Sequence, residues 1–422
     1  MLDDLSARGL IHDSTQLGAL RSRLAEGPIT LYYGCDPSAD SLHVGNLIGL
    51  LVMRRFQLAG HRPIVLAGGA TGMIGDPGGR STERNLLDDA TLAKNLEGIV
   101  PQLRQFLDFD DSPNGARLVD NRSWTVAMSV IDFLRDVGKH VTVNQMLGKE
   151  SVRTRIASEH GISYTEFSYM LLQANDFVNL SELEGCEMQI GGSDQWGNIS
   201  LGVELVRKRL GGHAHALTWP LLTRPDGSKY GKSAAGEQMW LGAGRMSPYR
   251  FYQAWLQSED SEMRKLLLQL TLLPVPDVDE IIAEHAEAPQ KRLAQRCLAD
   301  ELVRLVHGDE QARTAAEASE LLFGGASVFD AGIDTFTTLR AEIPTAELGR
   351  DVVIGMSVVD LAAEAGLTRS KTEARQVAEQ GGLRVNDEPA AVDRHITDAD
   401  LLHGKFLMLR RGKRSHHLVE VV

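Results

Sequence analysis

The sequence predicts an α/β fold, in which a Rossmann-like, doubly wound parallel sheet is followed by an all-helical domain and a small α+β domain. In the first half of the chain, short β-rich runs alternate with helical patterns and are separated by loops that contain glycine. This order of strand, glycine loop, helix and strand is typical of a doubly wound sheet. From residue 246 the apolar pattern is helical throughout, and a short unit with two helices and β-like segments begins after residue 350.

The first elements of the predicted sheet are bounded by turn-forming residues. Gly34 and the pair Asp36-Pro37 close the first strand, and Gly60 ends the first helix. Ligands of such sheets bind at the carboxyl ends of the strands, where two of these loops lie. The predicted elements are a strand at 29–33, a helix at 47–59, a strand at 63–67 and a glycine-dense loop at 68–79.

The second half of the chain divides where its composition changes. Residues 263–270 and 291–306 show the apolar spacing of helices. Gly332 and Pro344 mark a less regular stretch, which we expect to be a linker. The predicted parts are an α/β domain at 1–222, a mobile polar loop at 223–245, a helical domain at 246–325, a linker at 326–350 and a small α+β domain at 351–422.

Composition and charge limit the classes of function. The chain has 422 residues, 43% of them hydrophobic, which predicts two or three domains. Its net charge of −13 repels polyanions, so any binding of nucleic acid must come from local basic clusters. Three cysteines without a CxxC pair argue against a disulfide framework and a zinc site. Because the sequence shows neither a signal core nor a run of about 18 apolar residues, we expect a soluble, cytoplasmic protein without a membrane partner.

A short polar motif, SLHVGN at residues 41–46, lies between the first strand and the first helix. The N-terminus of a helix offers unpaired N–H groups and a partial positive charge, which suit a phosphate group. Gly45 leaves room for a nucleotide to approach the backbone, and His43 can donate to phosphate oxygens. The pattern fits a simple cap equally well, in which His43 and Asn46 only begin the helix.

A second motif, KYGKS at residues 229–233, lies in the polar loop. Lys229 and Lys232, on backbone that neighbouring glycines make adaptable, can fold over a triphosphate and neutralise the charge that develops on a leaving pyrophosphate. Taken alone, the motif is more simply explained as a solvated basic loop.

Together the two motifs resemble the paired signatures of class I aminoacyl-tRNA synthetases, where they lie on opposite sides of one ATP. Four longer stretches make the resemblance more specific, because they are similar to bacterial tyrosyl-tRNA synthetases and occur in the same order. With the tail, they extend the resemblance over nearly the whole chain. The stretches are YYGCDPSADSLH at 32–43, GMIGDP at 72–77, YMLLQAND at 169–176 and QIGGSDQWGN at 189–198.

The resemblance implies that the α/β domain activates tyrosine and that the side chains of Tyr32 and Asp176 bind its phenolic hydroxyl, a group that both donates and accepts. Tyr169, Gln173 and Asp176 are spaced i, i+4 and i+7 and share one helix face, where their polarity suits a pocket wall better than a core. The alternatives are a core position for Tyr32, a surface position for Asp176 and turn hydrogen bonds for the glutamines. The implied tyrosine-binding residues are Tyr32 and Asp176 on the phenol, Asp76, Tyr169 and Gln173 on the ammonium group, and Gln189 and Gln195 on the carboxylate and reacting phosphate.

The resemblance also implies ATP as co-substrate, with magnesium carried by ATP and without a protein-bound metal or organic cofactor. Catalysis would then rest on positioning and on stabilisation of developing charge, not on a nucleophilic side chain. The implied ATP-binding residues are Gly34, Asp36, Ser38, His43, Gly45, Asn46, Asp194, Lys229 and Lys232. The implied catalytic residues are His43, Lys229, Lys232, Ser38, Ser233, Arg80 and Arg84.

Three residues depart from the commonest pattern of the family. Asn46 stands in place of the second histidine of the first signature, Arg80 where many members have lysine, and Ser38 where many have threonine. Asn46 can still donate a hydrogen bond, and the charge and the hydroxyl persist at the other two positions.

The tail at 351–422 resembles the RNA-binding fold named after ribosomal protein four of the small subunit, which implies tRNA(Tyr) as partner. In an acidic chain, clustered basic residues are what binding of RNA phosphates requires, although a tail that only aids solubility is the alternative. The implied tRNA-binding residues are Arg369, Lys371, Arg375, Arg384, Arg410, Arg411 and Lys413.

The family also implies a homodimer. The apolar stretch 126–137 could contribute to its interface, or this stretch could belong to the core.

Two other functions remain compatible with the sequence. A tryptophanyl-tRNA synthetase has a related fold, but Asp176 opposite Tyr32 favours a phenol over an indole. A non-catalytic RNA-binding protein on a synthetase scaffold would be expected to lack His43, Lys229 or Lys232, all of which are present.

Overall fold

Two compact units make up the part of the chain that the computed structural model describes. The described residues are 1–77, 87–158, 161–224, 226–228, 230–231, 233, 236–412 and 415–422. The first unit combines Met1–Met246 with Ser258–Leu298, and the second combines Ser247–Gln257 with Ala299–Val422. The residues predicted as one helical domain, 246–325, are thus divided between the two units, and the predicted domain limits stay a prediction.

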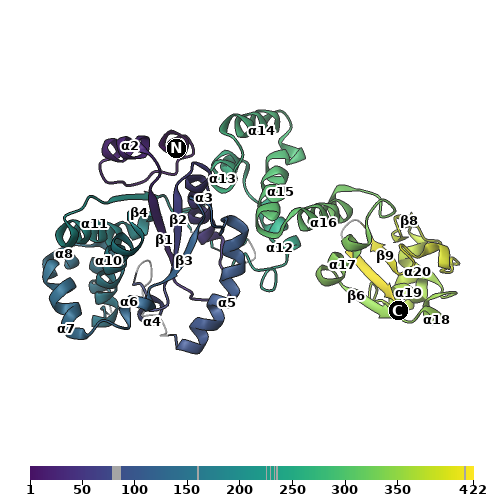
Figure 1. The fold of residues 1–422 in the computed structure, drawn as a ribbon. Coiled ribbons are helices and arrows are strands. Elements are labelled where there is room, and N and C mark those ends of the chain that lie inside the picture. The colour runs from purple at the N-terminus through teal and green to yellow at the C-terminus, as the bar shows by residue number, and fades with distance from the viewer. Residues whose placement is uncertain are drawn as a thin grey trace. The chain divides into compact units, whose positions relative to one another are not determined.

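A five-stranded parallel sheet forms the centre of the first unit (Figure 1). The strands lie in the order β3-β2-β1-β4-β5, so the order reverses between β1 and β4. In doubly wound sheets, ligands bind at the carboxyl ends of the strands at such a reversal. The predicted fold class is therefore confirmed. The strands are β1 Thr30–Cys35, β2 Arg62–Ala67, β3 Arg117–Asp120, β4 Cys186–Gly192 and β5 His215–Trp219.

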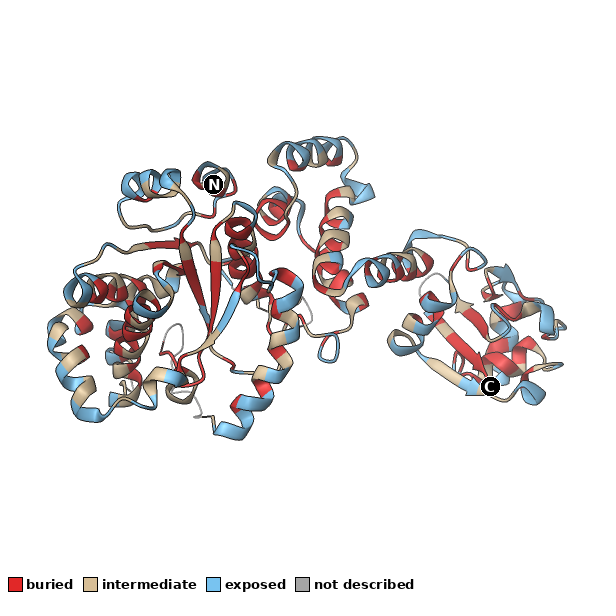
Figure 2. Cartoon of the chain, in the orientation of Figure 1, coloured by how far each residue is buried: buried red, intermediate tan, exposed pale blue. Residues whose placement is uncertain are grey.

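Helices cover both faces of this sheet. A central strand such as β2 is therefore buried on both faces, which explains its nearly continuous apolar sequence. In Figure 1, α3 (Val44–Leu58) and α5 (Asp89–Phe106) lie on one side, and α10 (Tyr164–Glu184) and α11 (Trp196–Leu210) lie on the other. Figure 2 shows most of the central strands as buried. Tyr32 of β1 belongs to the core on the α10 side, together with Phe177 and Leu201.

Two element boundaries differ from those predicted. β1 does not end at Gly34, because Gly34 and Cys35 continue the ladder opposite Leu66 and Ala67 of β2. α3 begins at Val44, three residues before the predicted start at 47, because its N-cap is His43. The polar motif at 41–46 therefore spans the end of a loop and the first turn of a helix.

The remaining elements of the first unit surround the sheet. The helices are α1 Leu2–Ala7, α2 Leu17–Glu26, α4 Thr71–Ile74, α6 Arg122–Thr125, α7 Val130–Asp132, α8 Val143–Leu147, α9 Glu150–Ile156, α13 Met263–Leu270 and α14 Val275–Glu287. The short 3₁₀ and π turns are η1 Phe133–Val137, η2 Gly138–His140, η3 Ser193–Gln195, η4 Asp260–Glu262 and η5 Pro289–Lys291. α15, Leu293–His307, passes from the first unit into the second.

The second unit joins helices to a mixed sheet in the order β6-β10-β9-β7-β8. The segment predicted as a linker, 326–350, contains a helix and the edge strand β6, which pairs in parallel with β10. It is therefore part of the C-terminal sheet and not a bare connection. The helices are α12 Pro248–Leu256, α16 Asp309–Ser319, α17 Ile333–Glu342, α18 Arg350–Val353, α19 Val358–Glu364 and α20 Lys371–Glu379, with the turns η6 Glu320–Gly324 and η7 Asp398–Asp400. The strands are β6 Thr345–Leu348, β7 Leu383–Val385, β8 Glu388–Pro389, β9 Phe406–Arg411 and β10 Ser415–Val421.

None of the helices in the described residues combines the length and the apolar character that crossing a bilayer would need.

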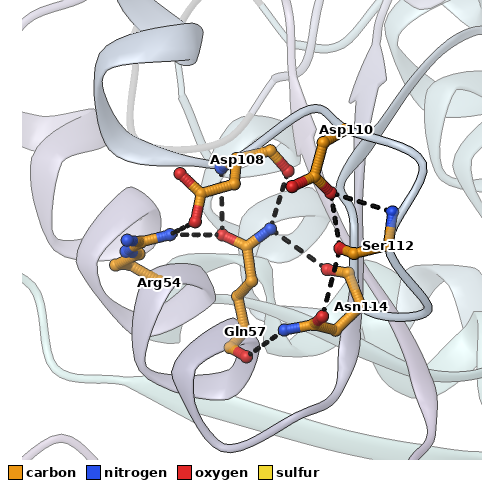
Figure 3. Close-up of polar contacts among 6 residues, drawn as sticks. All are labelled: Arg54, Gln57, Asp108, Asp110, Ser112 and Asn114. Carbon is orange, nitrogen blue, oxygen red and sulfur yellow. Dashed lines mark hydrogen bonds and ion pairs between the residues drawn. The ribbon is translucent and has the colours of Figure 1, made fainter.

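The C-terminal end of α3 is fixed by Gln57, whose side chain is buried among the loop residues that follow α5 (Figure 3). Gln57 Nε2 donates to the carbonyl oxygens of Asp108 (2.8 Å) and Asn114 (3.1 Å), and Oε1 accepts from the Asp108 N–H (3.1 Å). The Asn114 amide donates back to the Gln57 carbonyl oxygen at 2.9 Å, and Arg54 binds both Gln57 and Asp108. One side chain thus satisfies three backbone groups of this loop.

Gln57→Ala should lower the free energy of unfolding by about 2–4 kcal/mol, because it removes three hydrogen bonds between a buried side chain and the loop backbone. Urea unfolding followed by circular dichroism measures the change. Gln105→Ala is the matched control, since Gln105 is an exposed glutamine on α5, and should cost less than about 0.5 kcal/mol. Equal costs for the two variants would contradict a stabilising role of the Gln57 network.

Candidate active site

A cavity of about 340 Å³ opens at the carboxyl ends of β1 and β4 in the first unit. Its walls combine a buried polar end with residues from the start of α3. All described residues predicted to bind tyrosine or ATP line it, although they come from segments far apart in the sequence. They are Tyr32, Gly34, Asp36, Ser38, His43, Gly45, Asn46, Asp76, Tyr169, Gln173, Asp176, Gln189, Asp194 and Gln195.

Of five further predicted residues, one does not line the cavity and four lie outside the described residues. Ser233 does not line the cavity; its N–H donates to the Glu237 carbonyl oxygen at 2.7 Å, in a turn of the polar loop. The predicted catalytic residues Lys229, Lys232, Arg80 and Arg84 lie outside the described residues.

The buried end of the cavity is formed by Tyr32 and Asp176. Tyr32 is 0% exposed, and its hydroxyl has no hydrogen-bond partner among the described residues. Asp176 Oδ1 accepts from the indole N–H of Trp124 (2.8 Å), and Oδ2 accepts from the Asn121 amide (3.0 Å). A carboxylate offers about four acceptor positions, so these two bonds leave capacity for a ligand.

Burial determines the protonation state of the two side chains at this end of the cavity. Burial raises the pKa of Asp176 to about 7, against the opposing effect of the hydrogen bonds from Asn121 and Trp124. Burial and the neighbouring Asp176 also raise the pKa of Tyr32 well above its usual value. Tyr32 is therefore a protonated donor at neutral pH, and Asp176 changes between acid and carboxylate near neutrality.

Sequence reasoning missed Asn121 and Trp124. Asn121 follows the carboxyl end of β3 directly, a position that signals a binding site in a doubly wound sheet. Trp124 lies in the short helix α6, and nothing in the local pattern indicates that its indole meets Asp176 of α10.

Two sets of hydrogen bonds hold the predicted polar residues above this end, one around Asp36 and one around Gln195. The hydroxyl of Tyr169 donates to Asp36 Oδ2 at 2.9 Å, and Gln195 Nε2 donates to Asp76 Oδ2 at 2.6 Å. Gln173 Nε2 donates to Gln195 Oε1 at 3.3 Å. These side chains therefore form one polar wall. Thr71, which donates to Asp36, and Asn198, which donates to Gln173, also belong to it and were not predicted.

Gln189 lies next to Tyr32 because β1 and β4 pair in register at these two residues. It is 2% exposed, and its Oε1 has no partner among the described residues. Buried polar atoms are normally hydrogen-bonded. The cavity thus holds two orphaned buried atoms, Tyr32 Oη and Gln189 Oε1, that a polar ligand would satisfy.

The start of α3 is capped reciprocally by the predicted residues. His43 Nδ1 accepts from the Gly45 N–H at 3.0 Å, and Asn46 Oδ1 accepts from the His43 N–H at 3.1 Å. The capping alternative is therefore correct, but both side chains also line the cavity. Because Nδ1 accepts, the ring proton is assigned to Nε2, and burial lowers the pKa of His43. The imidazole is thus neutral near pH 7 with one N–H to donate. A Cβ on Gly45 would lie 2.7 Å from His43 Cε1, so glycine is needed there.

Backbone hydrogen bonds join the first motif to the segment that follows the second. The Val44 N–H donates to the Met239 carbonyl oxygen at 3.0 Å, and the Leu241 N–H donates to Leu42 at 2.8 Å. The Met239 N–H in turn donates to the carbonyl oxygen of Gly231 at 3.0 Å. The Trp240 ring lies 6.2 Å from the ring of His43. The structure therefore brings the described part of KYGKS to the start of α3.

In the second unit, most of the predicted tRNA-binding residues already have polar partners. Lys371 pairs with Asp360 at 2.7 Å, Arg411 with Glu373 at 2.7 Å and Arg410 with Asp387 at 3.9 Å. Arg384 donates to the Asp387 carbonyl oxygen at 2.6 Å. Arg369 and Arg375 are exposed, and Lys413 lies outside the described residues.

Within the described ranges, no three histidine, cysteine, aspartate or glutamate side chains are grouped so that they could hold a metal ion.

Two family models match the chain. The model "tRNA synthetases class I (W and Y)" matches residues 24–324, and the model "Tyrosine--tRNA ligase SYY-like C-terminal domain" matches residues 335–419. The second match begins before residue 351, in agreement with the place of β6 in the C-terminal sheet.

Curated relatives match over the full length. The chain is 51% identical over 430 residues to the tyrosine–tRNA ligase of Opitutus terrae, covering 100% of both chains. It is 48% identical over 416 residues to that of Mycobacterium tuberculosis, covering 98% of this chain and 97% of the relative.

A solved structure, a C-terminally truncated mitochondrial tyrosyl-tRNA synthetase of Aspergillus nidulans, matches with a TM-score of 0.70 and 29% identity over 76% of this chain and 94% of that chain. A tryptophanyl-tRNA synthetase of Encephalitozoon cuniculi, at 12% identity and a TM-score of 0.54 over 74% of this chain and 86% of that chain, shares the fold alone. With full-length identities near one half, the chain belongs to the tyrosine–tRNA ligase family of class I tRNA synthetases.

Proposed function

We propose that the cavity binds tyrosine at its buried end and ATP beside the start of α3, and that it forms tyrosyl-adenylate. The observation that carries this proposal is the pair Tyr32 and Asp176. A buried hydroxyl without a partner among the described residues stands next to a carboxylate with unused acceptor capacity. A phenolic hydroxyl accepts from Tyr32 and donates to Asp176, so it completes both.

The same pair accounts for selection against phenylalanine. Phenylalanine fits the apolar outline of tyrosine but offers nothing to the Tyr32 hydroxyl or to Asp176, which would stay buried and unpaired. Tyrosyl-tRNA synthetases are themselves the standard example of this kind of discrimination. Asn121 and Trp124 support it, because their hydrogen bonds hold the Asp176 carboxyl in one orientation.

The polar wall suits the charged groups of the amino acid. We assign the ammonium group to Asp76, Tyr169 and Gln173. Asp76 and Tyr169 are joined to the wall through Gln195 and Asp36. We assign the carboxylate to Gln189 and Gln195, whose side-chain amide N–H groups can donate to it. The unsatisfied Oε1 of Gln189 is an acceptor and would need a donor of the ligand instead.

In the proposed first step, a carboxylate oxygen of tyrosine attacks the α-phosphorus of ATP in line. The bond from this phosphorus to the bridging oxygen breaks, and pyrophosphate leaves with the electron pair. Because the substrate supplies the nucleophile, the protein contributes position and charge stabilisation. His43 would donate its Nε2 proton to phosphate oxygen, with Ser38 and Asn46 as further donors and Asp194 on the ribose.

Four positive charges are assigned to the pyrophosphate by the family resemblance alone, at Lys229, Lys232, Arg80 and Arg84. Ser233 is retained as a hydrogen-bond donor on the same basis. Asp36 and Asp76 line the cavity, but their carboxyls already accept hydrogen bonds from protein side chains. We therefore propose that magnesium enters bound to the ATP phosphates and is not held by these carboxyls alone.

In the second step, a ribose hydroxyl at the 3′ end of tRNA(Tyr) attacks the carbonyl carbon of tyrosyl-adenylate, and AMP leaves. We propose that the C-terminal sheet unit binds this tRNA through exposed basic residues. Neither Arg369 nor Arg375 forms an ion pair within the described residues, whereas Lys371 and Arg411 do. The first two are therefore the principal positions for phosphate contact.

We also propose a homodimer, whose interface includes the stretch 126–137. Val126, Val130 and Ile131 are 67%, 74% and 68% exposed, so they do not belong to the core of this chain. Neighbouring apolar side chains exposed to this degree mark an interaction surface, and a second copy would cover it. Sedimentation velocity on the full chain tests the proposal, which a monomer at micromolar concentration would contradict.

ATP–pyrophosphate exchange with tyrosine, phenylalanine and tryptophan supplied separately tests the proposed function. We expect exchange with tyrosine alone, and in Tyr32→Phe a KM for tyrosine raised about ten-fold, since one hydrogen bond is lost. Tyr164→Phe is the matched control, because this tyrosine is 73% exposed. Exchange with tryptophan would overturn the roles of Tyr32 and Asp176, and no exchange with any of the three would favour a binding protein.

The pKa of Asp176, about 7 in the empty cavity, predicts a pH dependence of tyrosine binding. The ionised carboxyl is the stronger acceptor for the phenolic proton, so the KM for tyrosine should fall, by up to about ten-fold, between pH 6 and pH 8. His43 is assigned to ATP and not to tyrosine, and burial lowers its pKa, so the effect on tyrosine is attributed to Asp176. Asp176→Asn should bind tyrosine weakly and without this pH dependence. A KM that stays constant in the unaltered protein would contradict the assignment.

The combined variant Arg369→Glu, Arg375→Glu should lower kcat/KM for charging of tRNA(Tyr) at least about ten-fold, because two phosphate contacts are replaced by repulsion. Its pyrophosphate exchange should stay unchanged, which is the internal control for folding. Charging at the original rate and with the original salt dependence would show that these residues do not bind tRNA.

A further inference from the structure

Tyr230, the second residue of the KYGKS motif, is anchored rather than exposed. It is 3% exposed, and its hydroxyl donates to Glu262 Oε2 at 2.5 Å. Glu262 is 6% exposed and is the last residue of η4, directly before α13. A buried bond between a hydroxyl and a carboxyl thus ties the second signature to the start of a helix in the same unit.

Further contacts hold the beginning of the loop in the same place. The guanidinium of Arg224 lies 4.5 Å from the centre of the Tyr230 ring, at the distance of a cation–π interaction. The Tyr230 N–H donates to the Leu222 carbonyl oxygen at 2.8 Å, and Lys265 of α13 donates to the Thr223 carbonyl oxygen at 2.9 Å. Thr223 and Tyr230, on either side of Arg224, are therefore held by α13 and by the turn η4 that precedes it.

From Tyr230 a continuous path leads to the start of α3. The next residue, Gly231, accepts from Met239, and Met239 accepts from Val44, each at 3.0 Å. Tyr230 and Gly231 both line the cavity. The position of the Tyr230 ring therefore sets how close the backbone of the second signature lies to His43, the N-cap of α3.

We propose that the hydrogen bond between Tyr230 and Glu262 is a positioning contact for the reaction with ATP, and that tyrosine binding does not depend on it. Tyr230 acts through the backbone of the signature, since its hydroxyl is directed to Glu262. The tyrosine end, at Tyr32 and Asp176, is built from β1 and α10 and shares none of these contacts. The inference rests on the proposed function and adds to it a residue of this chain that the signature lysines alone do not explain.

Tyr230→Phe is the test variant, because it removes one oxygen atom and keeps the buried ring. In pyrophosphate exchange its KM for ATP should rise about ten-fold, the loss expected for one hydrogen bond. Tyrosine affinity, measured by equilibrium dialysis without ATP, should be unchanged. Tyr249→Phe is the control, since Tyr249 is a buried tyrosine of the second unit that does not line the cavity.

Variants of Glu262 test whether the bond to Tyr230 positions the loop for ATP or only stabilises the fold. Glu262→Gln keeps an acceptor for the hydroxyl and should show a smaller rise in the KM for ATP, whereas Glu262→Leu should match Tyr230→Phe. The double variant Tyr230→Phe, Glu262→Leu should be no worse than either single one, because both remove the same contact. Additive effects would overturn the pairing.

Three outcomes would contradict the inference. Tyr230→Phe could lower the melting temperature without changing the KM for ATP, which would make the bond purely structural. The variant could change ATP and tyrosine binding together, which would indicate general damage. It could bind ATP more tightly, which would mean that the bond holds the loop away from its working position. If the unaltered protein shows no exchange with tyrosine, the proposed function itself fails, and this result is distinct from the other three.

Discussion

The parallel pairing of β1 with β4 is the constraint on which the site depends. The strand order reverses between these two strands, so the helices that follow them leave toward opposite faces and a hollow remains at their carboxyl ends. The register sets Tyr32 beside Gln189 and Tyr33 beside Ile190. Because side chains alternate along a strand, a slip by one residue would turn Tyr32 to the opposite face of the sheet, away from α10 and Asp176.

The buried polar groups of Tyr32, Gln189 and Asp176 suit ligand binding but lower the stability of the folded protein. A raised pKa means that the folded state disfavours the charged form of Asp176, so this residue lowers the free energy of unfolding progressively as the pH rises from 3.8 to about 7, and by a constant amount above that. Tyr32 Oη and Gln189 Oε1 are buried without partners among the described residues, which also costs free energy. Asn121 and Trp124 offset part of the cost at Asp176. A core chosen for stability alone would place apolar side chains at these positions, and this conflict with ordinary packing is typical of functional sites.

The sequence was sufficient to locate the cavity but not its supporting contacts. Residues such as Asp36 and Asp194 were identified through motifs shared with tyrosyl-tRNA synthetases, and the doubly wound sheet brings these motifs together at the carboxyl ends of its strands. Trp124 and Glu262 were not identified, because each reaches the site across the fold and nothing in its own neighbourhood indicates a partner. For the same reason β6 was predicted as a linker: it is a short strand whose partner β10 lies at the far end of the chain.

The acidity of the chain shapes its proposed contact with RNA. With a net charge of −13, the protein as a whole repels a polyanion, and attraction has to be local. In the second unit, Asp360 and Glu373 pair with Lys371 and Arg411, so part of the basic cluster is already neutralised. A phosphate would have to displace these carboxylates, whereas Arg375 offers its charge without such competition among the described residues. The proposed contact therefore depends on a few guanidinium groups, on α20 and in the loop before it, and a diffuse positive field contributes little. A tRNA whose backbone fits these positions would be favoured over other polyanions by geometry more than by charge.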